Sequence, residues 1–164
     1  MIEAIIFDLD GTLIHLPIDY EKLFQEFKKI MQTDNIQPVT EVISKLDKNT
    51  RQQIFKVWNK AENAAATKIT INKQGIEIYK SYSQKPKALV TMQGKTVVKN
   101  ILAQLGLSFN FAVTREDSLN RTEQLENAAE KLKTRFDSIL FVGNTENDLR
   151  AAEKVGCQFL RIDK

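Results

Sequence analysis

The chain has 164 residues, 42% of them hydrophobic, so it can bury the core of one domain, with or without a small insertion. The net charge is only +3 and no dense basic block occurs, which argues against nucleic acid as a partner. The single cysteine, Cys157, excludes an internal disulfide and a thiolate metal cluster. We expect it to be a small buried residue in a strand.

The first residues of the chain bear on where in the cell the protein is expected. The first strand begins at Met1-Ile2-Glu3, which leaves no room for a leader peptide, and no apolar run is long enough to span a bilayer. We therefore expect a soluble, cytoplasmic protein with no membrane partner. The oligomeric state is left open.

A short apolar run from Ile2 to Phe7 predicts a buried strand that ends in the acidic turn Asp8-Leu9-Asp10-Gly11. Ligands of open α/β sheets bind at the carboxyl ends of the strands. Asp8 and Asp10 are two positions apart, so in extended chain their side chains point the same way and can meet at one metal ion or one substrate. The alternative is an ordinary strand followed by an Asp-Gly turn.

The next part of the chain predicts helices without an intervening strand. Asp19 is placed to cap the first, a short second helix follows a loop near residues 35–40, and Thr50 begins the spacing of a capping box before the third. The aromatic residues of these helices are expected to pack the helices together.

Such a block between two strands predicts a helical lid. We expect it to comprise residues 15–71, with residues 1–14 and 72–164 forming the α/β core. His15, the only histidine, is expected to be a loop residue outside the site.

Helices and strands alternate in the remainder of the chain. Further apolar runs predict strands near residues 88, 109, 138 and 157. Gly106 and Gly156 predict left-handed ends for two of the helices between them. Strands joined by helices in this way predict an open, parallel, doubly wound α/β sheet that is covered on both faces.

Polar residues follow these strands. Thr91 and Met92 come after the strand near residue 88, where a hydroxyl and backbone amides suit the oxygens of a phosphate. Arg121 precedes a predicted helix, and Asn144 and Asp148 follow the strand near residue 138. These side chains are expected at the same edge of the sheet as the first acidic turn.

The segment Asp8-Leu9-Asp10-Gly11-Thr12, followed by a long helical insertion, resembles the nucleophile motif of the haloacid dehalogenase superfamily of phosphohydrolases. Asp10 points to phosphoryl chemistry, because the dehalogenases of that superfamily carry a different residue there. Thr91 resembles the second motif, a Ser or Thr at the end of an apolar strand. The resemblance covers the whole core and implies a helical cap inserted after the first strand.

Two positions depart from the superfamily's pattern. A lysine normally begins the helix of the third motif, whereas here the nearest counterpart is Arg121, which keeps the charge in a larger, planar group. The alternative is a solvent-facing arginine before a helix capped by Thr122. In the fourth motif, a GDxxxD loop, Asn144 replaces the first acid and Asp148 retains the second. An asparagine oxygen brings no charge, so the resemblance implies a weakened magnesium site.

The resemblance implies a magnesium-dependent phosphomonoester hydrolase that acts on a small phosphorylated metabolite. Asp8 is expected to form an aspartyl-phosphate, with Asp10 as the general acid and base. Mg²⁺ and Arg121 are expected to offset the charge of the phosphoryl oxygens, and Thr91 and Met92 to bind the substrate. The expected magnesium ligands are Asp8, the carbonyl of Asp10, Asn144 or Asp148, and water.

Two other classes stay open. A binding or regulatory protein that keeps the fold but has lost most turnover fits the departures at Arg121 and Asn144, which both fall on groups that handle charge. A receiver domain phosphorylated for signalling also has acids at the end of its first strand. The DxDGT motif and the inserted helices argue against a receiver domain.

Overall fold

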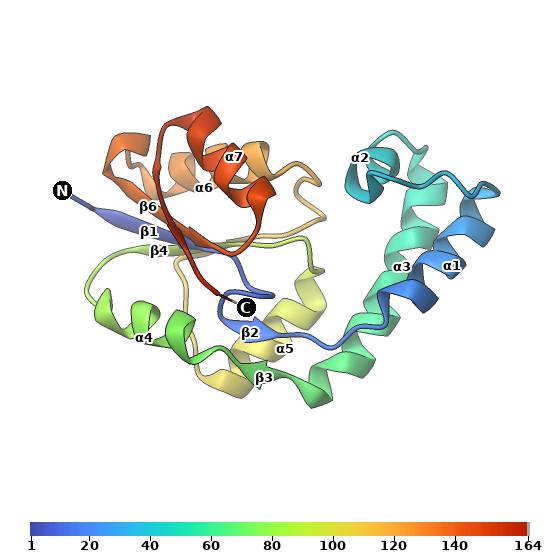
Figure 1. Cartoon of the computed structure of the whole chain (residues 1–164), viewed down its shortest axis with the longest axis horizontal. Helices are drawn as coiled ribbons and strands as arrows, with labels where there is room; N and C mark the ends of the chain where they lie inside the picture. Colours follow the sequence, from blue (N-terminus) through green and yellow to red (C-terminus); the bar gives the residue numbers. More distant parts are fainter. Residues whose placement is uncertain (164) are drawn as a thin grey trace.

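A parallel five-stranded sheet forms the centre of the structure, a computed structural model in which residues 1–163 are described (Figure 1). Its strands are β1 (Ala4–Phe7), β4 (Lys87–Val90), β5 (Phe111–Val113), β6 (Ile139–Gly143) and β7 (Gln158–Arg161). The order is β5-β4-β1-β6-β7, so the chain leaves the central β1 and builds the sheet outward on both sides. The predicted doubly wound α/β class is confirmed.

Helices cover both faces of the sheet. Successive residues of a strand point to opposite faces, and all four residues of β1 are buried. Ile5 and Phe7 pack with α4 (Lys73–Ser81) and α5 (Lys95–Leu105), and Ala4 and Ile6 pack with α6 (Arg121–Leu132) and α7 (Glu146–Val155). In Figure 1 these helix pairs lie on opposite sides of the sheet. Burial on both faces explains why the strands read as continuous apolar runs.

Helices α1 (Tyr20–Met31), α2 (Val39–Ser44) and α3 (Lys48–Ala65) lie beside the sheet (Figure 1). They have an apolar cluster of their own, which includes Phe27, Ile54 and Trp58. We call them the inserted helices. The short strands β2 (Ile14–His15) and β3 (Thr70–Ile71) pair antiparallel where the chain enters and leaves this unit, and the 3₁₀ turn η1 (Ala66–Lys68) precedes β3. A second 3₁₀ turn, η2 (Phe136–Ser138), precedes β6.

Two points remain, one on the expected domain division and one on membrane-spanning helices. The division into a core of 1–14 and 72–164 and a lid of 15–71 stays a prediction, although β2 and β3 pair next to both of its boundaries. Within residues 1–163, no helix combines the length and the apolar composition that crossing a membrane requires.

Some local predictions hold and others are wrong. Asp19 caps α1 as predicted, since its carboxylate accepts a hydrogen bond from the N–H of Lys22. The capping box at Thr50 is wrong: α3 is capped by Asp47, whose carboxylate accepts hydrogen bonds from the N–H and the hydroxyl of Thr50, so the helix begins earlier. Cys157 is half-buried and precedes β7, rather than lying buried within a strand, and burial raises the pKa of its thiol to about 11.

Helix α4 supports the turn that follows β1. A Cβ atom on Gly75 would overlap the backbone carbonyl of Thr12, so only glycine allows the helix to approach this closely. Asn72 caps α4, because its side chain accepts from the N–H of Gly75, while its own N–H donates to the carbonyl of Leu13 over 2.9 Å. The turn that carries Asp10 therefore rests on the start of α4.

We expect Gly75→Ala to lower the free energy of unfolding by about 1–3 kcal/mol, the usual cost of overpacking. Inside a helix, alanine would otherwise stabilise by up to about 1 kcal/mol, so the sign of the effect tests the contact. Urea denaturation measures it. The exposed neighbour Gln74→Ala is the control and should change stability by less than about 0.5 kcal/mol. Unchanged or increased stability of Gly75→Ala would contradict the close approach.

Candidate active site

Asp8 and Asp10 lie directly after β1, at the carboxyl edge of the sheet. The N–H of Asp8 donates to the carbonyl of Val142 over 3.0 Å, which keeps Asp8 in line with the sheet, and its side chain is almost fully buried. Asp10 is partly exposed, and its Oδ1 accepts from the N–H of Leu16 over 2.9 Å. Gly11 turns the chain with φ of 85°, a conformation that favours glycine.

Arg121 reaches the end of β1 from the first position of α6. Its Nη2 lies 3.1 Å from Oδ1 of Asp8, its Nε lies 3.0 Å from Oδ1 of Asp148, and its Nη1 donates to Gln124 over 2.6 Å. The residue is only 9% exposed. The solvent-facing alternative is therefore wrong. The helix is capped by Asn120 and not by Thr122, because the Asn120 side chain accepts from the N–H at its third position.

Asp148 and Asn144 belong to the start of α7. Asp148 is fully buried, and its Oδ2 accepts from the N–H groups of Asn144 and Thr145, each over 3.1 Å, as part of a capping box. A Cβ atom on Gly11 would overlap the side-chain amide of Asn144, so this amide lies directly against the turn after β1. The structure thus brings Asn144 to the acidic turn and uses Asp148 to hold Arg121 and the backbone of the loop.

The electrostatic balance of this cluster centres on Asp8. Burial raises the pKa of Asp8 to about 7, Arg121 opposes that rise, and the neighbouring carboxylates of Asp148 and Asp10 add to it. A carboxylate in this environment is stabilised by any further positive charge. Among residues 1–163, no group of three or more His, Cys, Asp and Glu side chains could hold a metal ion. An oxygen site here would combine the two aspartates of the turn with the amide of Asn144.

Thr91 lies directly after β4, the neighbour of β1 in the sheet, and is fully buried. Its hydroxyl donates to the side chain of Gln93, whose N–H donates back to that hydroxyl over 3.1 Å. Gln124 donates to the carbonyl of Thr91 over 2.9 Å while accepting from Arg121. Gln124 therefore links the arginine beside Asp8 to the segment that holds Thr91 and Met92.

His15 lies closer to this cluster than expected. Its Nδ1 is 4.0 Å from Oδ1 of Asp10, although the side chain is 54% exposed. The reason is the turn after β1, which brings the chain back so that His15, in β2, stands beside Asp10.

Several side chains near the cluster escape prediction from the sequence. Gln124 is three positions after Arg121, on the same face of α6, and that spacing was the available signal. Glu62 and Arg115 form a buried ion pair beside Met92, but they are 53 positions apart and no local pattern connects them. Gln93 shows no pattern beyond its closeness to Thr91.

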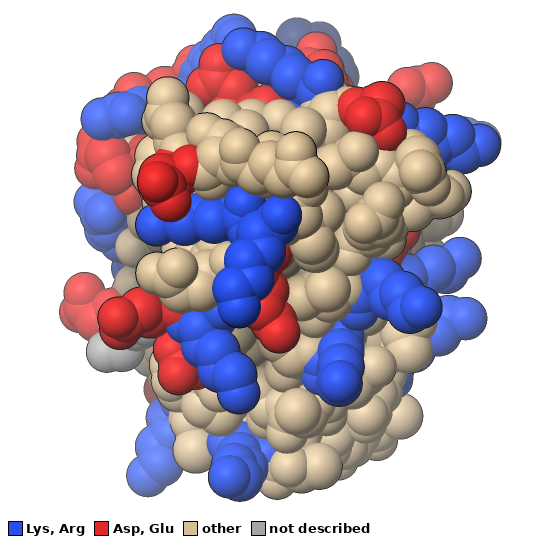
Figure 2. All heavy atoms as spheres, turned by 90° about the vertical axis from the view of Figure 1, so that its right-hand side faces the viewer, with Lys and Arg blue, Asp and Glu red and all other residues tan. Residues whose placement is uncertain are grey.

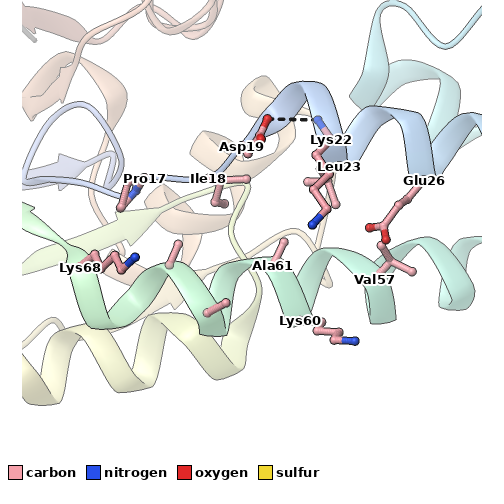
Figure 3. Close-up of a pocket in the computed structure, with 12 residues that line it drawn as sticks. Pro17, Ile18, Asp19, Lys22, Leu23, Glu26, Val57, Lys60, Ala61 and Lys68 are labelled. Carbon is pink, nitrogen blue, oxygen red and sulfur yellow. Dashed lines mark hydrogen bonds between the residues drawn. The ribbon is translucent and has the colours of Figure 1, made fainter.

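A separate groove lies between α1 and α3 (Figure 3). It has a volume of about 390 Å³, and its lining combines apolar residues such as Ala61 with Lys22, Lys60 and Lys68. Figure 2, which views the molecule from the right-hand side of Figure 1, shows Lys and Arg side chains spread over that face, with Asp and Glu among them. None of the residues that line the groove belongs to the cluster around Asp8.

We expect Arg121→Met to lower the free energy of unfolding by about 3–5 kcal/mol, because it leaves the buried carboxylates of Asp8 and Asp148 without their cation. The matched control is Arg135→Met. Arg135 pairs with Asp137 over 3.0 Å, but both side chains are largely exposed, so its loss should cost less than about 1 kcal/mol. Denaturant unfolding compares the two variants. If the two variants lost the same free energy of unfolding, the ion pairs of Arg121 would contribute no more than an exposed pair, which would contradict the buried arrangement.

Comparisons of the fold with solved structures give many matches of low sequence identity. A hydrolase from Pseudomonas syringae is 17% identical, with a TM-score of 0.75 over 97% of this chain and 84% of that one. CbbY from Rhodobacter sphaeroides, in complex with phosphate, is 17% identical, with a TM-score of 0.71 over 100% and 87%. A predicted phosphoglycolate phosphatase from Haemophilus somnus is 17% identical, with a TM-score of 0.67 over 98% and 84%.

Sequence comparisons add the family. A search of curated proteins gives no match. A family model described as haloacid dehalogenase-like hydrolase matches residues 5–162, which include most of β1, the inserted helices, and the helices α6 and α7 that carry Arg121 and Asp148. The predicted resemblance is confirmed, and the chain belongs to the haloacid dehalogenase-like hydrolase family.

Proposed function

We propose that this protein hydrolyses phosphomonoesters of small metabolites through a covalent phosphoryl intermediate on Asp8. The observation that carries the proposal is the position of the Asp8 carboxylate, which lies at the end of the central strand, 3.1 Å from the guanidinium of Arg121. Thr91 stands at the end of the neighbouring strand. Family membership supports hydrolysis, and the likeness of the fold to a phosphate complex of CbbY supports a phosphoryl group as ligand.

The proposed reaction has two displacements. In the first, an oxygen of Asp8 attacks phosphorus and forms a P–O bond while the ester oxygen leaves with a proton from Asp10. In the second, Asp10 removes a proton from water, the water oxygen attacks the same phosphorus, and the bond to Asp8 breaks to release phosphate. Asp10 is suited to proton transfer because it is partly exposed and is held in place by the N–H of Leu16.

Arg121 is proposed to balance the charge of the transferred group. Asp148 and Gln124 hold its guanidinium, so the group is oriented before substrate binds. Thr91 and Met92 are proposed to bind the substrate at the end of β4. Gln124 connects these two parts of the site, because it contacts both Arg121 and the carbonyl of Thr91.

The donors around Asp8 fit magnesium, which prefers oxygen ligands and often takes only one or two carboxylates from the protein. We propose that Asp8, the carbonyl of Asp10 and Asn144 hold the ion. Asp148 belongs to the same set, but its oxygens already accept from Arg121 and from backbone N–H groups. Its proposed contribution is to hold Asn144 and Arg121 in place. Bound Mg²⁺ would offset the negative charge of the phosphoryl oxygens and favour the ionised form of Asp8.

The inserted helices are proposed to act as a cap over this site, with residues 15–71 as the cap and residues 1–14 and 72–164 as the core. A second candidate function keeps the same fold as a binding or regulatory protein with little turnover. The observation that favours it is Asn144, which brings an uncharged oxygen to the acidic turn where the family's pattern has an acid.

A chromogenic phosphate ester, assayed with and without magnesium, tests the proposal directly. We expect magnesium-dependent release of phosphate, and we expect Asp8→Asn to reduce it to background because an amide cannot serve as the nucleophile. Circular dichroism should show unchanged helix content in the variant. The control is Asp137→Asn, which should retain full activity because Asp137 is exposed and precedes β6, at the edge of the parallel sheet opposite Asp8. Substantial turnover by Asp8→Asn would rule out the covalent mechanism.

Restoring the missing acid separates the two candidate functions. Asn144→Asp adds an anionic ligand, so we expect a lower magnesium concentration for half-maximal rate and a higher rate at low magnesium. If the protein is a binder, calorimetry should show tighter magnesium binding without turnover. If neither metal affinity nor rate changes, Asn144 is not a ligand and the proposed site is wrong.

A further inference from the structure

A buried ion pair joins the inserted helices to the sheet. Glu62 lies on α3, and Arg115 lies in the segment after β5, 53 positions later. Nη1 of Arg115 is 2.6 Å from Oε2 of Glu62, and Nη2 is 2.8 Å from Oε1, so the pair is bidentate. Both side chains are 0% exposed. The pair is therefore a fully buried polar contact between α3 and the segment after β5.

The same two side chains hold the segment after β4. The carboxylate of Glu62 accepts from the N–H of Gly94 over 3.2 Å, and Nη1 of Arg115 donates to the carbonyl of Met92 over 3.1 Å. The N–H of Arg115 also donates to the carbonyl of Gln93. Residues 91–94, which we call the β4 loop, are therefore bound on one side by the ion pair.

Side chains of α3 enclose the guanidinium of Arg115. Its central carbon lies 4.2 Å from the centroid of the Trp58 ring and 5.3 Å from that of Phe55, within the range of cation–π attraction. Asn59 accepts a hydrogen bond from Nη2. Arg115 comes from the sheet side of the molecule but is surrounded by α3, so these contacts require α3 to be docked.

A buried ion pair is by itself weak evidence of a stabilising role. Taking two charges out of water costs about as much as their attraction returns, and apolar residues of similar size often stabilise a protein as well or better. Burial raises the pKa of Glu62 and Arg115 opposes that rise, as expected for a carboxylate that is removed from water and paired with a guanidinium. Apolar residues could not replace the hydrogen bonds that Glu62 and Arg115 form with the backbone of the β4 loop.

We propose that Glu62 is a positioning residue of the active site, acting through Arg115 and Gly94 to give the β4 loop the shape that binds phosphate. This rests on the proposed function, in which Thr91 and Met92 bind the substrate. A residue of the inserted helices then sets the backbone of a binding segment in the sheet. Docking of α3 and ordering of the β4 loop become one event.

The test compares variants that remove different parts of the contact. Glu62→Asp keeps a negative charge near Arg115 but is one methylene too short to keep both contacts. The double variant Glu62→Leu/Arg115→Met removes both charges together and leaves no lone buried ion. Glu41→Gln is the control, since Glu41 forms an exposed ion pair with Lys45 on α2.

Two measurements need no turnover. Amide hydrogen exchange reports on the β4 loop, with β6 (Ile139–Gly143) as the internal reference for global destabilisation. Fluorescence quenching by acrylamide reports on Trp58, the only tryptophan of the chain, whose ring packs on Arg115. For both Glu62 variants we expect at least tenfold faster exchange in the β4 loop relative to β6, together with stronger quenching, and neither change in Glu41→Gln.

Calorimetry with inorganic phosphate and kinetics with the chromogenic ester connect the loop to the site. We expect at least a tenfold weaker Kd for phosphate and a matching rise in KM in the Glu62 variants, with a smaller change in kcat. The proposal would be overturned if the exchange rate in the β4 loop rose only as much as the exchange rate in β6. Unchanged phosphate affinity despite faster exchange in the β4 loop would also overturn it. If the wild-type protein binds no phosphate and hydrolyses no ester, the proposed function fails, and the exchange measurement still decides whether Glu62 orders the loop.

Discussion

The burial of Asp8 at the end of the central strand is the constraint on which the rest of the site depends. A carboxylate there is taken out of water, and the raised pKa of Asp8 reflects that cost. Arg121 offsets part of it from 3.1 Å away, but a buried guanidinium needs partners of its own, and Asp148 and Gln124 supply them. The start of α6, the start of α7 and the end of β1 are therefore fixed relative to one another by one charge balance.

The planar shape of the guanidinium explains how an arginine fits at position 121. A lysine carries one compact charge on a flexible stem, whereas a guanidinium presents donors in fixed directions. Here Nε, Nη1 and Nη2 each face a different acceptor, on Asp148, Gln124 and Asp8. Substituting Arg for Lys retains the positive charge and adds a rigid link to Gln124, and through Gln124 to the carbonyl of Thr91. The departure from the family's pattern at this position is compatible with phosphoryl chemistry.

The sheet and the membership of the acidic cluster could be predicted, because apolar runs mark strands and parallel strands bring their carboxyl ends to one edge. Asp8, Arg121, Asn144 and Asp148 do meet there. Helix starts were less certain, since Asp47 and Thr50 both suit a cap and only the packing of α3 decides between them. The Glu62–Arg115 pair was beyond prediction. A charged residue on an amphipathic helix usually faces water, and nothing near Glu62 in the sequence indicates that its partner lies 53 positions away.

Hydrogen bonds hold the backbone of the β4 loop from two directions. Gln124 reaches the carbonyl of Thr91 from the sheet side, and Arg115 reaches the carbonyl of Met92 from the side of the inserted helices. At the start of α5, the N–H groups of Gly94 and Lys95 point to the carboxylates of Glu62 and Glu116. A helix N-terminus attracts anions, and here protein carboxylates already satisfy it. A bound phosphoryl group would therefore be directed away from the start of α5 and toward Thr91, Arg121 and Asp8, where the proposed chemistry takes place.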